Sequence, residues 1–415
     1  MRDIMLEGDY AFRVMENGEA EFCWFRSQYE GTGTDIPETV EIPDRVGEHP
    51  VTGIQPLGFV EFEAIRRISL PDTVVFSEGT PFESCPNLEE IVVSPGHPSL
   101  TVENGLLIDR AAKRVLCCPA GSRMETVQVP EWVTSVGNNA FANCTQIRSV
   151  VLPEGILEIG QGAFFGCVRL GRISVPSGVR EIGNYTFMDC AGLKEISLPE
   201  GIRRIGDFAF AFCTSLTSLR LPDSVESFGC FSFSDCENLR EVNLPLQLKE
   251  IDLPPFIRCS RLAAVTIPDG QETYRMEGSL LINREQREVV CCFPALVQKG
   301  TAIPESVRRI GDFAFGSISS LRNIVVPEGV EIIGSQAFTG CEGLRSVHLP
   351  DSLKTLEDFA FLGCRRLRSI NLPRSIQSFG SLCLYRESYL QAAVKRNSAA
   401  RDFCRDHRIP YRIAK

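Results

Sequence analysis

The fold is decided by a pattern that is plainest in residues 156–176, ILEIGQGAFFGCVRLGRISVP, and in residues 179–199, VREIGNYTFMDCAGLKEISLP. The two stretches align without a gap at a distance of 23 residues. In both, Ile-Gly is followed by Phe, Cys, Leu, another aliphatic residue and a closing proline. Repetition at this spacing predicts a solenoid in which every unit forms one coil.

The same columns continue far along the chain in both directions. Cysteine follows three residues after each phenylalanine of a central block of six units, at Phe141, Phe164, Phe187, Phe210, Phe233 and Phe256. The register resumes before this block at Phe59 and Phe82, and after it at Phe315, Phe338 and Phe361. The sequence therefore contains eleven recognisable units.

The segment Leu-x-x-Ile-x-Leu-Pro of each unit has the alternation of a short β-strand. Strands of consecutive coils should lie side by side, about 4.8 Å apart. Proline ends the strand because it has no N–H to donate and its φ angle is restricted. One coil cannot bury its phenylalanine alone, so stacked coils must share a continuous core. We expect a right-handed, β-rich superhelix with short helical turns on its outer side.

Two insertions interrupt the array at equal intervals. Phe82 and Phe141 are separated by 59 residues, as are Phe256 and Phe315, which corresponds to one unit plus 36 residues. Residues 105–121 and 278–295 each predict a β-hairpin whose second strand ends in a cysteine pair. The predicted organisation is a β-rich N-terminal cap at 1–51, a solenoid at 52–384 with hairpin insertions at about 95–130 and 269–304, and a C-terminal helical cap at 385–415.

The full pattern, (V/I)-x-x-I-G-x-x-A-F-x-x-C-x-x-L-x-x-I-x-L-P, resembles the BspA-type (Treponema-type) leucine-rich repeat. Departures are mild: Phe62 and Ile318 replace the cysteine of their units, and Cys383-Leu384 replaces Ala-Phe where the array ends. Both chain ends resemble the caps of that family. The resemblance implies a non-enzymatic leucine-rich repeat scaffold for protein–protein binding, linked in bacterial surface proteins to adhesion and to host-matrix or cell-surface partners.

Charge and composition exclude several other classes of protein. Lys and Arg number 43 against 53 Asp and Glu, a net charge of −10, which argues against nucleic acid or an anionic membrane as partner. No apolar stretch of about 18 residues is present, so we expect no membrane insertion. The four histidines, His49, His97, His348 and His407, are too scattered for a multi-histidine metal centre.

The sequence also lacks a recognisable catalytic constellation of nucleophile, base and orienting group. We therefore predict no enzyme activity, no cofactor and no metal. Residues 1–10, MRDIMLEGDY, contain no apolar leader, so the chain as given suggests a cytoplasmic protein. The family resemblance suggests the cell surface or secretion instead if a leader was removed.

Seventeen cysteines require an explanation. Nine occupy the repeat column, where a thiol acts as a small apolar side chain in the core, although disulfides or metal binding stay open as alternatives. In the pairs Cys117-Cys118 and Cys291-Cys292, strand alternation predicts one thiol in the core and one in solvent. An alternative function is therefore a thiol-dependent redox or enzymatic protein that uses Cys118 and Cys292.

The remaining candidate site is the outward face of the strands. Its residues are mostly small or polar, and a solenoid presents such rows as an extended surface for a protein or glycan partner. The ligand-face candidates are Ser174, Ser197, Arg220, Asn243, Thr266, His348 and Asn371. A solvated sheet without a ligand, which would make the protein a structural spacer, is the alternative. The aromatic residues Trp24, Phe25, Tyr29, Tyr385 and Tyr389 are other possible anchors, but we expect them to cover the ends of the core.

Overall fold

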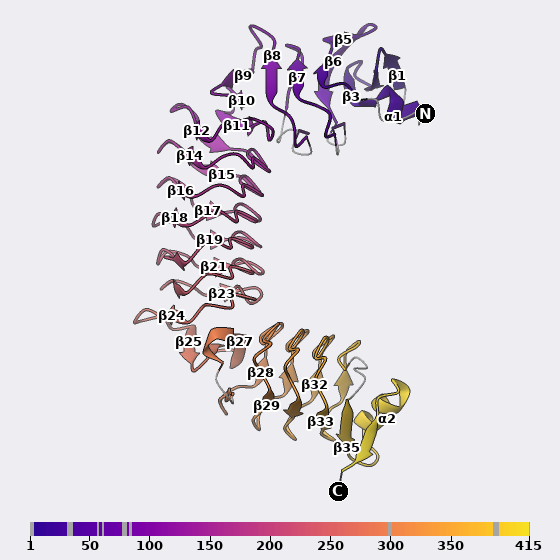
Figure 1. Ribbon diagram of the computed structural model, residues 1–415, viewed down its shortest axis with the longest axis vertical. Helices are drawn as coiled ribbons and strands as arrows, with labels where there is room; N and C mark the ends of the chain where they lie inside the picture. The colour runs from indigo at the N-terminus through magenta and orange to yellow at the C-terminus, as the bar shows by residue number, and fades with distance from the viewer. Residues whose placement is uncertain are drawn as a thin grey trace. The chain divides into compact units, whose positions relative to one another are not determined.

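A computed structural model describes residues 4–30, 36–55, 58, 59, 62–76, 81, 82, 85–297, 301–384 and 390–414. The chain divides into two compact units, residues 1–213 and 214–415 (Figure 1). Both units are β-solenoids, in which parallel strands of successive coils pair at a spacing of 23 residues.

The first unit begins with a small sheet. Strands β1 (Ile4–Glu7), β2 (Tyr10–Val14) and β3 (Ala20–Phe25) are antiparallel, and β3 leads into the short helix α1 (Arg26–Glu30). β6 (His49–Ile54) pairs parallel with β3 and antiparallel with the edge strand β5 (Arg45–Val46). The ring of Phe22 stacks on that of Phe59 with 5.0 Å between centroids, so this sheet covers the first coil of the repeat.

The coils of the first unit form two sets of parallel strands. The longer strands are β4 (Thr39–Glu41), β7 (Arg67–Leu70), β8 (Glu90–Val93), β12 (Thr126–Gln128), β14 (Ser149–Val151), β16 (Arg172–Ser174) and β18 (Glu195–Ser197). The shorter strands are β13 (Ser135–Val136), β15 (Glu158–Ile159), β17 (Glu181–Ile182) and β19 (Arg204–Ile205). Ser149 pairs with Arg172 and Arg172 with Glu195, so equivalent residues of successive coils lie side by side.

The second unit repeats this arrangement. Its longer strands are β20 (Ser218–Leu219), β22 (Glu241–Asn243), β24 (Ala264–Thr266), β29 (Asn323–Val325), β31 (Ser346–His348), β33 (Ser369–Leu372), β35 (Gln391–Val394) and β36 (Tyr411–Ile413). Its shorter strands are β21 (Ser227–Phe228), β23 (Glu250–Ile251), β28 (Arg309–Ile310), β30 (Ile332–Ile333), β32 (Thr355–Leu356) and β34 (Ser378–Phe379). Helix α2 (Ala399–Asp406) begins at Ser398, whose side chain accepts a hydrogen bond from the Arg401 N–H.

Each insertion forms three antiparallel strands. They are β9 (Leu100–Glu103), β10 (Leu106–Asp109) and β11 (Arg114–Cys117) in the first unit, and β25 (Tyr274–Glu277), β26 (Leu280–Asn283) and β27 (Glu288–Cys292) in the second, where the 3-10 turn η1 (Pro294–Leu296) follows. The last strand of each insertion pairs parallel with the first short strand of the next coil, β13 or β28. The predicted hairpins are therefore continuous with the solenoid.

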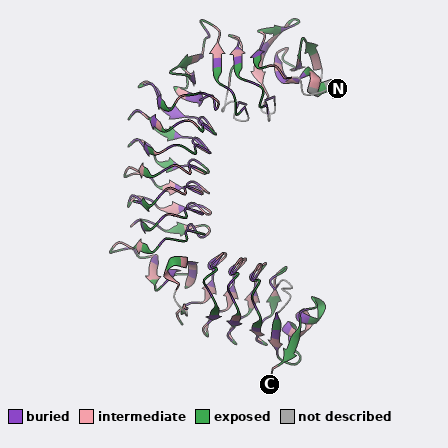
Figure 2. Ribbon diagram, in the orientation of Figure 1, coloured by how far each residue is buried: buried purple, intermediate pink, exposed green. Residues whose placement is uncertain are grey.

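Stacked phenylalanine rings run through the core of the coils. The rings of Phe164 and Phe187 are 5.3 Å apart and inclined by 1°, and Phe187 stacks in the same way on Phe210. In the second unit, Phe338 stacks on Phe361 at 5.0 Å. These rings are buried, in line with the buried inner positions of every coil in Figure 2. The predicted mutual packing of the phenylalanine column is confirmed.

Candidate binding surface

The outward face of β14, β16 and β18 carries a groove of about 440 Å³. Two of the ligand-face candidates, Ser174 and Ser197, line it and are exposed. Ile173 and Ile196, which precede them, also border the groove but are more deeply buried. Val151, with 42% of its surface exposed, adds an apolar wall. Small side chains thus leave the backbone of three neighbouring strands accessible along this part of the sheet.

Two charged residues, Arg172 and Glu195, line the same groove. They are register partners on β16 and β18 and both are exposed. Neither forms an ion pair with any residue that the structure describes, although Arg and Glu pairs at this spacing do form elsewhere, as between Arg204 and Glu181 at 3.4 Å. Both charges are therefore available to a ligand. Neither residue is among the ligand-face candidates that the sequence suggested.

The other ligand-face candidates fall into two groups. Arg220, Thr266 and His348 are exposed in the second unit. Asn243 and Asn371 instead use their amides within the fold. The Asn243 carboxamide accepts from the Leu221 N–H at 2.9 Å and donates to the Leu221 carbonyl at 2.8 Å, and Asn371 makes the same two bonds to Leu349. These amides link neighbouring coils, so they have little hydrogen-bonding capacity left for a partner.

The aromatic residues of the N-terminal cap cover the core or stack on one another. Phe25 is buried against Phe59 and Phe62. Trp24 stacks on Tyr29 with 6.4 Å between centroids, and Tyr29 is half exposed. Tyr385 and Tyr389, the two candidates at the other end, lie outside the described residues.

The cysteine column makes a set of hydrogen bonds that the sequence reasoning missed. Seven thiols of the column donate to the backbone carbonyl of the phenylalanine 26 residues earlier, in the preceding coil, and Cys144 donates to the carbonyl of Cys118 at the same offset. The sulfur–oxygen distance is 3.1 Å from Cys167 to Phe141, 3.1 Å from Cys190 to Phe164, and 3.0 Å from Cys341 to Phe315. The constant offset between the two columns is the signal in the sequence that could have suggested this pairing.

The vicinal cysteines contradict the expectation that one thiol of each pair faces solvent. Cys117, Cys118, Cys291 and Cys292 are all buried. A β-bulge shifts the register of both hairpins just before the cysteines, which breaks the alternation of the strand. The following coil then covers the second cysteine, because the N–H of Cys118 bonds to Ala140 and that of Cys292 to Ala314.

Burial also opposes thiol chemistry at these positions. It raises the pKa of Cys292 to about 12, and it also raises the pKa of Cys291 and of the column residue Cys167 above the ordinary value. A thiol with a raised pKa holds its proton at neutral pH and is a poor nucleophile. The geometry therefore gives no support to the redox alternative at Cys292.

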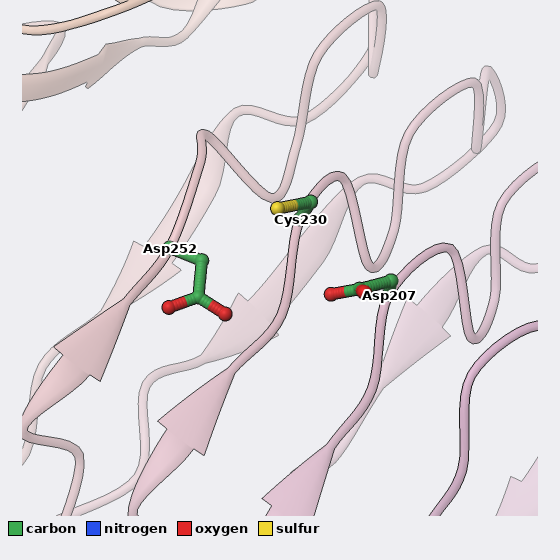
Figure 3. Close-up of side chains that lie close together, drawn as sticks. All are labelled: Asp207, Cys230 and Asp252. Atoms are coloured by element: carbon green, nitrogen blue, oxygen red, sulfur yellow. The ribbon is translucent and has the colours of Figure 1, made fainter.

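Cys230 is the exception among the 17 cysteines, all of which the structure describes, because its side chain is partly exposed. Figure 3 shows Cys230 after β21 and Asp252 after β23, on neighbouring coils of the second unit, with Asp207 of the first unit also drawn. The Cys230 sulfur and an Asp252 carboxylate oxygen lie within 4.8 Å. Two such donors are fewer than a protein zinc site uses, so this pair does not define a metal site.

A second cavity, of about 400 Å³, lies beside β25–β28 and contains Arg309 and Glu288. Arg309 pairs with Glu288 at 3.4 Å, with Asp312 at 2.7 Å and with Glu357 at 3.0 Å. Burial raises the pKa of Glu288 even though Arg309 opposes the shift. Arg309 thus bridges three carboxylates from neighbouring coils, as in a structural ion-pair network, and the four side chains together carry an excess of negative charge.

Parallel coils, a continuous core and an accessible strand face define a leucine-rich repeat scaffold. The family model described as "BspA type Leucine rich repeat region (6 copies)" matches residues 118–228, 180–277 and 292–399, more than half of the chain. The chain belongs to this family, which confirms the resemblance drawn from the repeat pattern. Members of the family are generally non-enzymatic scaffolds.

Solved structures are similar to this chain at low sequence identity. A leucine rich cell surface protein from Faecalibacterium prausnitzii is 20% identical with a TM-score of 0.50, and the match covers 95% of this chain and 89% of that one. A leucine-rich repeat protein from Bacteroides ovatus is 21% identical with a TM-score of 0.45, covering 99% and 100%. No curated protein matches the chain at a significant level. None of the helices in the described residues is long and apolar enough to span a bilayer.

Proposed function

We propose that the protein is a binding scaffold of a bacterial cell surface, and that the groove over β14, β16 and β18 receives a protein partner. The observation that carries this proposal is the exposed, unpaired charges of Arg172 and Glu195 beside Ser174 and Ser197 in one groove. Arginine is enriched in protein interfaces, and small neighbours let a partner approach the strands closely. Membership of a family of bacterial surface repeat proteins supports the same reading.

The charges also indicate what the partner must present. A carboxylate opposite Arg172 and a cation opposite Glu195 would complete two charge-assisted hydrogen bonds, and an apolar side chain would cover Val151. Complementary charges mainly determine orientation and association rate. The other ligand-face positions, Arg220, Thr266 and His348, extend the proposal to the strand face of the second unit.

Binding of the full chain to purified fibronectin and fibrinogen, measured by surface plasmon resonance, tests this proposal. The variants Ser174→Tyr and Arg172→Glu should each weaken binding at least about tenfold, because one fills the groove and the other reverses a contact charge. Arg180→Glu is the matched control, since Arg180 is exposed beside β17 on the other set of strands. Equal loss in the control, or no binding of either matrix protein by the unaltered chain, contradicts the proposal.

A further inference from the structure

A third pocket, of about 850 Å³, lies at the carboxyl ends of β33, β35 and β36 in the second unit. β33 and β35 are neighbouring parallel strands (Figure 1), and β36 pairs with β35. Because parallel strands end at the same edge of a sheet, the residues that follow them gather there. Arg374 follows β33, Lys395 and Arg396 follow β35, and Ile413 ends β36.

Positive charge is concentrated at this edge, although the protein as a whole is acidic. Residues 385–415 contain eight Lys and Arg against three Asp and Glu, in a chain with a net charge of −10. The side chains of Arg374 and Arg396 are exposed and form no ion pair with a described residue. Asp351 is the one acidic residue in the lining of the pocket. The pocket thus offers several cationic donors together with a single carboxylate acceptor.

Ser375 lines the pocket, and its hydroxyl differs from that of the equivalent serine one coil earlier. The hydroxyl oxygen is buried and has no hydrogen-bond partner among the described residues. The equivalent residue one coil earlier, Ser352, donates to the Val330 carbonyl and accepts from the Gly329 N–H, both at 2.8 Å. Buried hydroxyls in native proteins are nearly always paired. The hydrogen bonds that Ser352 makes to the preceding coil therefore have no counterpart at Ser375 among the described residues.

We propose that this pocket binds a carboxylate-bearing sugar, such as the uronic acid unit of an acidic polysaccharide. The sugar carboxylate would bind Arg374 and Arg396, and the sugar hydroxyls would donate hydrogen bonds to Asp351. The apolar face of the ring would cover Ile413, which is 42% exposed. A pocket of this size is within the usual range for a small organic ligand, about 300–1,000 Å³, and is too large for a lone sulfate.

Asp351 distinguishes this ligand from other anions. Its carboxylate repels every anion, but sugar hydroxyls can donate hydrogen bonds to it and so offset this repulsion, whereas sulfate has no donor at neutral pH. The probe is therefore a tetrasaccharide of alternating glucuronic acid and N-acetylglucosamine. Its matched control is the same tetrasaccharide with the carboxyl groups reduced to alcohols. Titration calorimetry of the full chain should show binding of the first and at least about tenfold weaker binding of the second.

Protein variants locate the site. Arg374→Ala combined with Arg396→Ala should weaken binding of the acidic tetrasaccharide at least about tenfold. Arg365→Ala combined with Arg366→Ala removes the same charge from an exposed turn before β33 and should leave the affinity within about twofold. An equal loss in this control would overturn the proposal, because it would show attraction by overall charge alone.

Competition experiments with other anions test the class of ligand. Inorganic sulfate and a peptide of alternating Glu and Leu should not displace the tetrasaccharide at equal concentration. Displacement by either, or equal affinity for the carboxyl-reduced sugar, overturns the assignment of an acidic sugar, as does an absence of binding. The comparison of the two tetrasaccharides uses the unaltered protein, so it decides the question even if a variant fails to fold.

Discussion

The thiol of Cys190 donates a hydrogen bond to the backbone carbonyl of Phe164, with 3.1 Å between sulfur and oxygen. The two residues belong to successive coils, and the same pair recurs from Cys213 to Phe187 at 3.2 Å. The cysteine column therefore joins coils through a directional bond as well as through packing. A small side chain with a weak donor suits this place, since it fits beneath the phenylalanine without adding a strongly polar group to the core.

Replacing Cys190 with alanine should lower the free energy of unfolding by about 1–2 kcal/mol, through the lost hydrogen bond and the cavity left by the sulfur. Urea denaturation followed by circular dichroism measures the change. Cys230→Ala, at the partly exposed thiol, should cost less than about 0.5 kcal/mol. If both substitutions lower the free energy of unfolding by the same amount, the hydrogen bond from the Cys190 thiol to the Phe164 carbonyl does not contribute to stability.

The thiols should resist modification in the folded protein. At pH 8, an aromatic disulfide reagent should react quickly with at most one of the 17 cysteines, Cys230, and with all of them in guanidinium chloride. Cys230→Ser should abolish the fast reaction. Rapid modification that persists in this variant and disappears in Cys118→Ser or Cys292→Ser would instead support a thiol-dependent function of the vicinal cysteines.

Stability should fall at alkaline pH. Burial raises the pKa of Cys292, Cys341 and Cys383 from the ordinary value near 9 to about 12. Below pH 9 these thiols are protonated in both states and their contribution is fully present. Between pH 9 and 12 the unfolded chain loses protons that the folded chain keeps, so the free energy of unfolding decreases, by up to about 1.4 kcal/mol per pH unit for each thiol.

Thermal unfolding at pH 7 and pH 10 measures this alkaline loss. The variant Cys341→Ala is the comparison: it should be less stable at pH 7 but should lose less stability on the change to pH 10. A melting temperature that stays constant between the two pH values would show that the buried thiols ionise as easily in the folded state as in the unfolded one.

Mutation should show that the Asn243 side chain stabilises the fold. Asn243→Ala leaves the Leu221 N–H and carbonyl without their side-chain partner, and the free energy of unfolding should fall by about 1–3 kcal/mol. Ser174→Ala, on the outward face of β16, should change it by less than about 0.5 kcal/mol. Urea denaturation measures the free energy of unfolding of both variants. Equal decreases would show that the Asn243 side chain contributes no more to stability than an exposed serine.

Much of the fold could be predicted because periodicity is a property of the sequence. The phenylalanine column predicted the ring stack of Phe164 and Phe187, and the alternation of each strand predicted that Ser174 and Ser197 face outward. The prediction for Cys118 and Cys292 was wrong, because a β-bulge and the following coil remove the solvent-facing side of that segment. A bulge depends on how two strands pair, and no residue in either hairpin indicates it.

The candidate site was only partly accessible to the same reasoning. The strand face was predicted from the repeat, but the sequence could not show that Asn371 turns its amide back onto Leu349 while Arg172 stays unpaired. Such differences depend on which groups come within hydrogen-bonding distance of each side chain, and side-chain packing determines those distances.

By itself, the sequence determined the length of the coil, the residues that enter the core and the places where the array is interrupted. A hydrophobic side chain at a fixed interval must be buried, and stacking is the arrangement that buries all of them. The tertiary structure alone decided which carbonyl receives each thiol, which charges stay unpaired and which chain segments meet around Arg374, Arg396 and Ser375. Those outcomes depend on contacts across neighbouring strands, where geometry rather than residue type selects the partner.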